Sequence, residues 1–301
     1  MSQTRTVGTA ILQLLADHGI EVVFGLPGVH NLAFWSAETP VRIVGVRHEQ
    51  ACVYAADGYA RATGRLGVAL TTTGPGAVNA LAAFGEAAVS GAPVLLISSD
   101  VSTALRSPDG PRGILHEMAD QAAPFASLGC RAITVTTAEE ALTEVAMAVA
   151  RSETSPGAPE YIGIPSDILN APWSEATPSV PTLTIAVAPP SLTAPAGLIT
   201  DSTRVIIWAG GGVTQCGVAG DAAVRALAER LGAPVVTTYA GRGVMAGHPL
   251  TIETSTHEPE VDALIGSADL LLVIGSGFDA MHTKNWRMSL PSRRAAISLG
   301  D

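Results

Sequence analysis

The sequence is poor in cysteine and in basic residues. Its three cysteines, Cys52, Cys130 and Cys216, are odd in number and far apart, so they support neither a disulfide framework nor a zinc site and fit a reducing cytosol best. Lys and Arg together number only 17 in 301 residues, and the formal net charge is −10. Because nucleic-acid binding draws on clustered basic side chains, we expect no nucleic-acid partner.

Long apolar runs are also missing. No stretch of the chain approaches the roughly 18 apolar residues that a membrane span needs. The N-terminus starts with polar residues and continues as an amphipathic helical pattern around Ile11–Leu15, without the apolar core and cleavage site of a signal peptide. We therefore expect a soluble, cytoplasmic protein with no membrane partner.

Apolar residues and glycine are plentiful. Hydrophobic residues make up 47% of the chain and glycines number 31, which suffices for a dry core with tight turns. Short β-branched runs alternate with alanine-rich helical runs, as in parallel βαβ units. The expected strands are Val22–Phe24, Arg42–Val46, Val68–Thr72, Pro93–Ser98, Arg131–Thr134 and Glu160–Ile164, then Arg204–Ala209, Pro234–Tyr239, Leu270–Ile274 and Ala295–Leu299.

The alternation breaks once, and this break predicts two domains. Six prolines lie between residues 171 and 201 among Ser, Thr and Ala, a composition that should hold neither a helix nor a strand ladder. We expect a first α/β domain over 1–170, a linker over 171–201 and a second α/β domain over 202–301. Both domains should be doubly wound parallel sheets, with Gly210–Gly212 as a turn and Val218–Leu231 as a helix in the second.

Three successive strands of the first domain end in polar or glycine-rich sequence. The first leads to a glycine loop at Gly25–Asn31, the second to Glu49 and the third to a second glycine loop at Thr73–Asn79. Carboxyl ends of parallel strands meet at one edge of a sheet, where open α/β folds bind ligands. Taken alone, Glu49 also fits a carboxylate that is stabilised by a helix N-terminus.

Four ordered motifs carry a family resemblance. They are Phe24–Gly28, Arg47–Gln50, Ala55–Arg61 and Gly74–Asn79, and their order and spacing resemble the thiamine diphosphate enzymes of the acetohydroxyacid synthase group, with benzoylformate decarboxylase as a more distant relative. In the second domain, Ala209–Val213 and Thr283–Trp286 resemble that group's central domain more loosely. The resemblance implies a pyrimidine-binding domain followed by a Rossmann-like central domain.

The resemblance assigns a catalytic role to Glu49. In this family the matching glutamate hydrogen-bonds N1′ of the cofactor's aminopyrimidine and so promotes loss of the proton at C2 of the thiazolium. The cofactor then decarboxylates a small 2-oxo acid, and the product is an aldehyde, a hydroxyketone or an acetohydroxy acid. This chemistry implies a lyase or a transferase, either a decarboxylase or a carboligase.

The same resemblance predicts the residues around the cofactor. Besides Glu49, they are Pro27, Gly28, Val29, Thr73, Gly74, Pro75, Gly76 and Asn79. Glycines at these positions would let the main chain approach the flat pyrimidine closely, although each glycine alone also fits a tight turn. Asn79 alone also fits a residue that caps or packs its helix end.

Two histidines and a glutamine are expected on the substrate side. The family often carries a glutamine facing the reacting centre where this chain has His116, a residue able to transfer protons near neutral pH. A surface histidine at a helix start explains His116 equally well. His30 and Gln121 are expected on the same side, while Thr71–Thr73 stands where pyruvate decarboxylase would carry paired histidines.

The sequence lacks two cofactor motifs. Gly210–Gly212 does not continue as G-x-G-x-x-G, so we expect no FAD in the second domain. Relatives hold Mg²⁺ and the cofactor's diphosphate with a Gly-Asp-Gly motif in a third domain, and this chain has neither, so we expect no metal ligands here. The interpretation we favour is a split enzyme whose diphosphate-binding subunit is a separate chain, with homodimerisation through the pyrimidine domain. A truncated single-chain enzyme and a non-catalytic regulatory relative are the alternatives.

Overall fold

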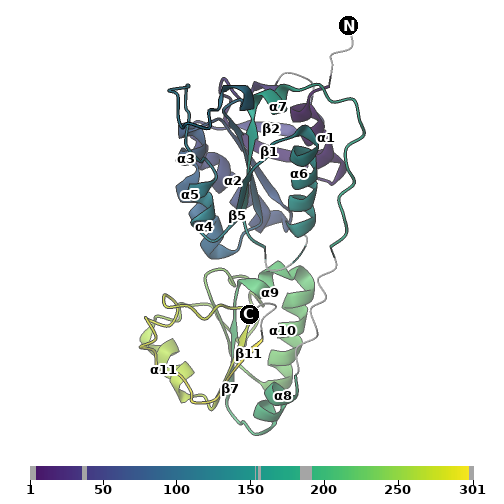
Figure 1. Cartoon of the computed structure of the whole chain (residues 1–301). Helices are drawn as coiled ribbons and strands as arrows, with labels where there is room; N and C mark the ends of the chain where they lie inside the picture. The colour runs from purple at the N-terminus through teal and green to yellow at the C-terminus, as the bar shows by residue number, and fades with distance from the viewer. Residues whose placement is uncertain (1–4, 36–38, 153, 155–156, 184–191, 298–301) are drawn as a thin grey trace. The chain divides into compact units, whose positions relative to one another are not determined.

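Strands and helices alternate along the chain in two separate α/β units. The computed structural model describes residues 5–35, 39–152, 154, 157–183 and 192–297, and the chain divides into units 1–185 and 186–301. Each unit holds one sheet, and every strand pair within both sheets is parallel (Figure 1). The predicted fold class is therefore confirmed. Each unit is described by itself below.

The first unit contains six strands and the helices between them. In chain order its elements are α1 Val7–Asp17, β1 Val22–Gly25, η1 Leu32–Phe34, β2 Arg42–Gly45, α2 Glu49–Thr63, β3 Gly67–Thr71, α3 Pro75–Asn79, α4 Leu81–Ser90, β4 Val94–Asp100, η2 Thr103–Leu105, α5 Ala123–Ala126, β5 Arg131–Thr134, α6 Ala138–Ser152, β6 Glu160–Pro165 and α7 Ser166–Asn170. The strand order is β2-β1-β3-β4-β6-β5, so the chain reverses its direction of travel across the sheet between β1 and β3. This reversal is the topological switch point, where open α/β sheets bind ligands.

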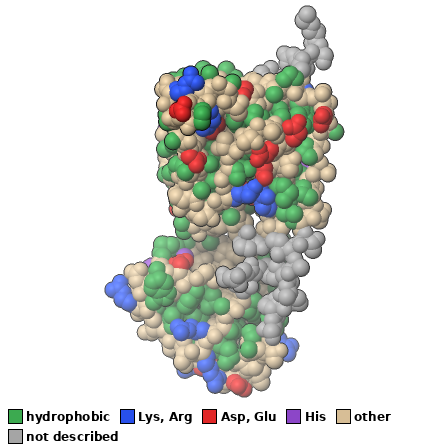
Figure 2. All heavy atoms as spheres, in the orientation of Figure 1, with side chains coloured by type: hydrophobic (Ala, Val, Ile, Leu, Met, Phe, Trp, Pro, Cys, Tyr) green, Lys and Arg blue, Asp and Glu red, His purple; other side chains and the backbone are tan. Residues whose placement is uncertain are grey.

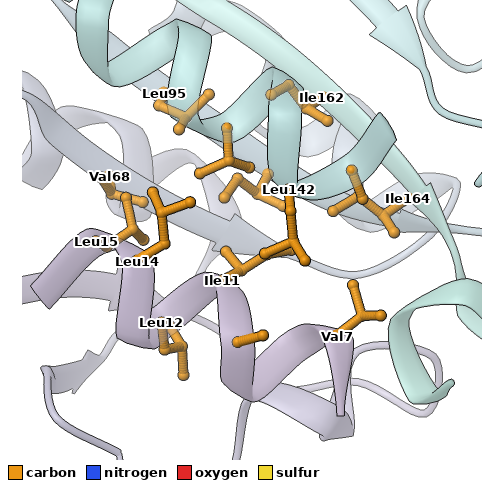
Figure 3. Packing of buried hydrophobic residues seen from close by; sticks show 14 of the residues in the cluster. Val7, Ile11, Leu12, Leu14, Leu15, Val68, Leu95, Leu142, Ile162 and Ile164 are labelled. Carbon is orange, nitrogen blue, oxygen red and sulfur yellow. The ribbon is translucent and has the colours of Figure 1, made fainter. Parts of the chain in front are cut away.

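One face of the first sheet is covered by α1 and α6. Helix α1 begins after Thr6, which forms a capping box with Thr9, and its apolar face is fully buried. Figure 3 shows the α1 side chains against Leu142 of α6 and against strand residues that include Val68 and Ile162. Removing one such leucine side chain costs about 2–5 kcal/mol of stability.

The other face of the sheet is covered by α2, α4 and α5. The aromatic centre of this face is Phe125, whose ring centroid lies 5.1 Å from that of Phe84 and 4.1 Å from that of Tyr161. Helix α2 lies so close to β3 that a Cβ atom on Gly67 would meet the main-chain oxygen of Ala56 at 2.0 Å. This close contact sets the distance between α2 and the sheet, and with it the position of the first residue of the helix, Glu49.

The second unit contains five strands. Its elements are α8 Thr193–Thr200, β7 Val205–Ala209, α9 Gly211–Gln215, α10 Gly217–Leu231, β8 Val235–Thr237, β9 Thr251–Ile252, α11 Pro259–Ser267, β10 Leu270–Ile274 and β11 Arg294–Ile297, and the strand order is β11-β10-β7-β8-β9. Helices α8 and α10 contribute to the apolar cluster on one face and α11 to the cluster on the other (Figure 1).

The structure differs from the sequence-based expectations mainly in the proline-rich stretch. Helix α8 forms where we expected none, because Pro195 falls in its first turn, where a missing N–H group costs little. At the other end of the stretch, Pro172 bridges to Thr6, and Trp173 is buried in the first unit. The expected turn at Gly210–Gly212 continues into α9.

No helix in the described part of the chain is long and apolar enough to cross a membrane. On the face drawn in Figure 2, Lys and Arg side chains lie scattered and are not gathered into one patch. Part of the last expected strand, residues 298 and 299, lies outside the described residues.

Candidate active site

The candidate site lies at the carboxyl ends of β1 and β3, which are neighbours at the switch point of the first sheet. Strands β1 and β3 pair in parallel, and the Leu26 N–H group donates to the Leu70 carbonyl at 3.1 Å, so both glycine loops leave the sheet side by side. Strand β2 pairs with β1 on its other side and leads through residues 46–48 to the start of α2. We call this region, from Leu26–Asn31 and Thr72–Asn79 to Glu49, the switch-point edge.

Glu49 is the first residue of α2. The helix is capped by His48, whose Nδ1 accepts the Gln50 N–H group at 3.2 Å, so the capping role does not fall on Glu49. The Asn79 amide, at the end of α3, donates to Oε2 of Glu49 at 3.0 Å. Among the described residues, Oε1 of Glu49 has no hydrogen-bond donor and the carboxylate has no ion-pair partner. Glu49 is half-buried, so one of its oxygens remains free at the edge.

Gly28 and Gly76 approach the same side chain from two loops. A Cβ atom on either glycine would lie 2.6 Å from the Thr72 side chain, so both positions require glycine. The added atom on Gly76 would also lie 3.5 Å from Oε1 of Glu49. Glycine at both positions thus lets the two loops pack closely against Thr72. At Gly76 it also leaves the main chain next to the carboxylate of Glu49.

Thr72 leaves an unpaired hydroxyl group at this place. Its Oγ1 atom is buried and has no hydrogen-bond partner in the described part of the chain, and the same holds for Oγ1 of Thr71 and Nδ1 of His30. A buried polar group without a partner typically costs about 1–3 kcal/mol. Three such atoms near the ends of β1 and β3 indicate a region that is arranged for a ligand and not for maximal stability.

Gln121 lies inside the unit and supports the second glycine loop. Its side chain is 1% exposed; Oε1 accepts the Gly74 N–H group at 2.5 Å, and Nε2 donates to the Ser99 carbonyl at 2.9 Å and to the Tyr161 hydroxyl at 2.6 Å. Gly74 has a φ of 64°, which a residue with a side chain rarely adopts. The glutamine therefore holds the loop from behind, and the structure does not bring it to the surface beside the histidines.

The two predicted histidines lie next to each other. The rings of His30 and His116 have centroids 6.1 Å apart in an edge-to-face arrangement. Burial, and then the neighbouring His116, lower the pKa of His30, while Asp100 opposes this shift. His116 is exposed, has a φ of 65°, and its carbonyl would lie 2.3 Å from a Cβ atom on Gly74, so its loop packs directly on the glycine loop.

The remaining predicted residues are placed as follows. Pro27, Val29 and Pro75 are exposed on the two loops, whereas Thr73 is buried and its hydroxyl lies 3.0 Å from that of Ser99. Sequence reasoning missed Asn31, which is fully buried and closes the first loop: its Oδ1 accepts the Gly28 N–H group at 2.7 Å, and its Nδ2 donates to the Leu26 carbonyl at 3.1 Å. An asparagine directly after a glycine loop is a typical turn signal and could have indicated it.

Cys52 lies one helical turn after Glu49 and is fully buried. Burial, followed by the negative charge of Glu49, raises the pKa of its thiol to about 12, and Sγ lies 3.8 Å from the Leu70 carbonyl. A thiol in this state is not a nucleophile. Cys52 therefore packs under the site and takes no part in its chemistry.

The site fits the pyrimidine end of thiamine diphosphate. It offers a half-buried carboxylate with one free oxygen, unpaired polar atoms beside it and main chain without side chains at Gly28 and Gly76. Such a set suits a flat ring that carries ring nitrogens and an amino group. For a metal ion the fit fails: no group of three or more His, Cys, Asp or Glu residues in the described ranges could hold one.

Comparison with known protein families agrees with this fit. Residues 5–123 match the family model described as thiamine pyrophosphate enzyme, N-terminal TPP binding domain, and residues 192–299 match the model of the thiamine pyrophosphate enzyme central domain. The chain belongs to the thiamine pyrophosphate enzymes. The resemblance that the four motifs predicted is confirmed, and the first match contains the whole switch-point edge.

Several curated proteins are similar over nearly the whole chain. A probable 2-ketoarginine decarboxylase of Pseudomonas aeruginosa is 36% identical over 96% of this chain and 51% of its own length. A probable acetolactate synthase large subunit of Methanocaldococcus jannaschii is 30% identical over 95% of this chain and 49% of its own length, and the acetolactate synthase large subunit of Corynebacterium glutamicum is 31% identical over 91% and 44%. The chain thus spans about half the length of the curated relatives it matches.

The corresponding edge of the second unit is closed by main chain. A Cβ atom on Gly210 would lie 2.3 Å from the Gly275 carbonyl, and one on Gly241 would lie 2.4 Å from the Ala209 carbonyl. His282 is paired on both ring nitrogens, with Asp279 at 2.9 Å and with the Tyr239 N–H group at 3.0 Å. An apolar cavity of about 420 Å³ lies beside β10 and β11, lined by Val273, Phe278, Trp286, Leu290, Arg294, Ala295 and Ala296. The glycine loops, the paired histidine and the apolar cavity of the second unit all differ from the arrangement around Glu49.

Proposed function

We propose that this chain supplies the pyrimidine-binding half of a thiamine diphosphate-dependent decarboxylase or carboligase that acts on small 2-oxo acids in the cytoplasm. The observation that supports this most is the carboxylate of Glu49, which Asn79 orients through one oxygen while the other oxygen remains free beside Thr72 and Gly76. A carboxylate that is oriented through one oxygen while the other has no donor can accept a hydrogen bond from a ligand.

Each side chain has a distinct part in this proposal. Thiamine diphosphate, when bound, supplies the carbanion chemistry that removes carbon dioxide from the substrate. Glu49 holds a proton between its free oxygen and a ring nitrogen of the pyrimidine, and Asn79 fixes the carboxylate for this exchange. Gln121 keeps the Gly74 loop in its positive-φ conformation. His116, which is exposed beside His30, delivers or accepts a proton on the substrate side.

The metal and the diphosphate require ligands from elsewhere. The described residues contain no metal-binding group of acidic, histidine or cysteine side chains. We propose that Mg²⁺ and the diphosphate are bound by a complementary diphosphate-binding domain, either on a partner chain or on further sequence of the same polypeptide, and that two pyrimidine domains pair as a homodimer. Native mass spectrometry of the protein purified from its own cells with magnesium and thiamine diphosphate distinguishes the two sources by the mass of the assembled chains.

The substrate is proposed from chemistry that the relatives' names share. One relative is named for 2-ketoarginine, which is itself a 2-oxo acid, and two for acetolactate, which can form by decarboxylative joining of two molecules of the 2-oxo acid pyruvate. A screen therefore starts with pyruvate and with 2-oxo acids that carry a basic side chain. We propose no flavin in the second unit, since its Gly210 and Gly275 loops pack main chain against main chain.

The decisive test replaces Glu49. In the assembled enzyme, Glu49→Gln should lower turnover at least about 100-fold, because general acid–base catalysis contributes roughly 10²–10⁴ in rate. Glu86→Gln is the matched control, since Glu86 is an exposed glutamate on α4 of the same unit. Turnover is measured as carbon dioxide release, and assembly is checked by native mass spectrometry. Comparable turnover in the two variants would refute the proposed role of Glu49 and favour a non-catalytic, binding-only protein.

A further inference from the structure

Arg106 follows the carboxyl end of β4, the strand next to β3 in the first sheet. Strand β4 ends at Asp100, whose side chain is fully buried. Nη2 of Arg106 lies 2.6 Å from Oδ2 of Asp100, while the arginine side chain keeps 34% of its surface exposed. The contact is a close ion pair between the guanidinium and the carboxylate. Over the described residues the guanidinium has no second ion-pair partner.

The loop that carries Arg106 is held from behind at two points. The Val101 N–H group donates to Oδ1 of Asp100 at 2.6 Å. Two residues later, Asp167 of α7 accepts both the N–H group, at 3.0 Å, and the hydroxyl group of Thr103. The short helix η2 and the arginine that follows it are therefore fixed to the end of the sheet.

The same loop adjoins the switch-point edge. Ser99, directly before Asp100, contacts the hydroxyl of Thr73 at 3.0 Å and accepts a hydrogen bond from Gln121 through its carbonyl. Asp100 also lies within electrostatic range of His30, whose pKa it raises against the effect of burial. Arg106 is thus a partly exposed cation that pairs with Asp100 and also lies within electrostatic range of Glu117, whose pKa it helps to lower.

We propose that Arg106 is the residue of this unit that binds a carboxylate group of the substrate, with Asp100 and Asp167 as positioning residues; this inference rests on the proposed function. Arginine offers a planar pair of N–H donors that matches a carboxylate, and an arginine already held by a buried acid loses little freedom on binding. The fully buried Asp100 cannot itself touch a substrate, so the partly exposed group of this ion pair is the cation. The pair therefore suits an anionic ligand better than a cationic one.

A purely structural role is the competing explanation. Arg106 would then exist only to neutralise the buried Asp100, because one buried charge without its partner is strongly destabilising. The same argument means that Arg106→Gln alone is a poor test, since loss of folding would imitate loss of binding. The test must therefore detect the carboxylate on wild-type protein.

The experiment measures protection of Arg106 against phenylglyoxal, an arginine-directed reagent. The full chain is treated with the reagent at constant ionic strength, with and without pyruvate, 2-oxoglutarate or the uncharged methyl pyruvate, and modification is quantified for each arginine by peptide mass spectrometry. At a concentration of twice the Kd, an acid should slow modification of Arg106 about threefold, since two-thirds of the sites are then occupied. Arg112, exposed in the same loop without an ion pair, is the control and should not change.

The outcomes separate the possibilities. Protection by both acids supports binding of the 2-oxo acid's own carboxylate, and protection by 2-oxoglutarate alone supports binding of a second carboxylate. Equal modification rates with and without both acids, equal protection of Arg112, or protection by methyl pyruvate would overturn the proposal. Asp100→Asn should abolish the protection while leaving Arg106 open to the reagent. Because the readout needs neither cofactor nor turnover, its result is independent of the Glu49→Gln test.

Discussion

The two sheets carry glycine loops at their carboxyl edges, and these loops do different things. In the first unit, Gly28 and Gly76 face a side chain, Thr72, and the hydroxyl of that threonine is buried without a partner. In the second unit, Gly210 faces the main chain at Gly275, and the buried His282 nearby is fully paired. The comparison shows that glycine content alone does not identify a binding site. The first edge differs in combining unpaired hydroxyl groups with a carboxylate oxygen that has no donor among the described residues.

The largest expected effect comes from Gly210→Ala in the second unit. The added Cβ atom would lie 2.3 Å from the Gly275 carbonyl and 2.6 Å from Cα of Ser276, and main chain cannot move aside as a side chain can. We expect a loss of about 3 kcal/mol or more in the free energy of unfolding of this unit. Urea unfolding monitored by tryptophan fluorescence measures it. A loss below 1 kcal/mol would mean that the edge is less tightly packed than the structure shows.

Gly76→Ala in the first unit should be milder and, unlike Gly210→Ala, reversible by a second change. Its Cβ atom would meet Cγ2 of Thr72 at 2.6 Å, a methyl group that Thr72→Ser removes. We expect Gly76→Ala to cost about 1–3 kcal/mol, and the double variant with Thr72→Ser to recover most of this loss. Thermal unfolding of the two single variants and the double variant tests the coupling. Simple addition of the two single effects would contradict the close contact.

A threonine in each unit gives a matched comparison of unpaired and paired hydroxyl groups. Thr72→Val removes a buried hydroxyl without a partner and should raise stability by about 1 kcal/mol, at the expense of cofactor binding. Thr283→Val removes a hydroxyl that donates to the Asp279 carbonyl at 2.8 Å and accepts the Trp286 N–H group at 3.1 Å, and should cost about 1–2 kcal/mol. Denaturant titrations measure both values. Effects of the same sign would remove the distinction between the two edges.

The smallest effect concerns pH. Because burial and His116 lower the pKa of His30, the unfolded chain binds more protons there than the folded chain as pH falls through the ordinary value of 6.5. The contribution of His30 to the free energy of unfolding is therefore fully present above pH 6.5. It is lost as the pH falls from 6.5 towards the lowered pKa of the folded state. His30→Asn should flatten the fall in unfolding free energy below pH 6.5.

Comparing wild type with the His30→Asn variant measures this effect. The pKa of Asp100 is raised by burial, which contributes a slope of the opposite sign. Because Asp100 interacts electrostatically with His30, the difference between the two profiles includes this coupling. Identical pH profiles would show that the environment of His30 does not oppose its protonation.

Much of the fold could be predicted because four of the described strands are buried along their whole length. Strands β3, β4, β6 and β7 appear as short apolar runs between glycines and helices, and most predicted bounds lie within one or two residues of the observed ones. Helix α11 was missed, although Pro259 at its start with Glu260 and Asp262 in its first turn is a recognisable signal. Strand β9 has only two residues and carries no pattern of its own.

The candidate site could be predicted in part. The carboxylate and the glycines were visible because each follows a strand, and the family motifs gave their order. The contact between Glu49 and Asn79 joins residues 30 positions apart and depends on how α2 and α3 pack, which no local pattern contains. Likewise, nothing in the sequence shows that Gln121 is buried or that Arg106 lies against Asp100.

The position of β6 in the first sheet has a consequence for the order of synthesis and folding. This strand, made late at residues 160–165, lies between β4 and β5, and α6 before it covers α1 at the start of the chain. A nascent chain that ends at residue 123, where the first family match stops, leaves β4 as an open edge and α1 uncovered. The sheet of the first unit can therefore be completed only after Pro165 has left the ribosome. Until then the nascent chain exposes an unpaired strand edge and the apolar face of α1, and a chaperone can bind such surfaces.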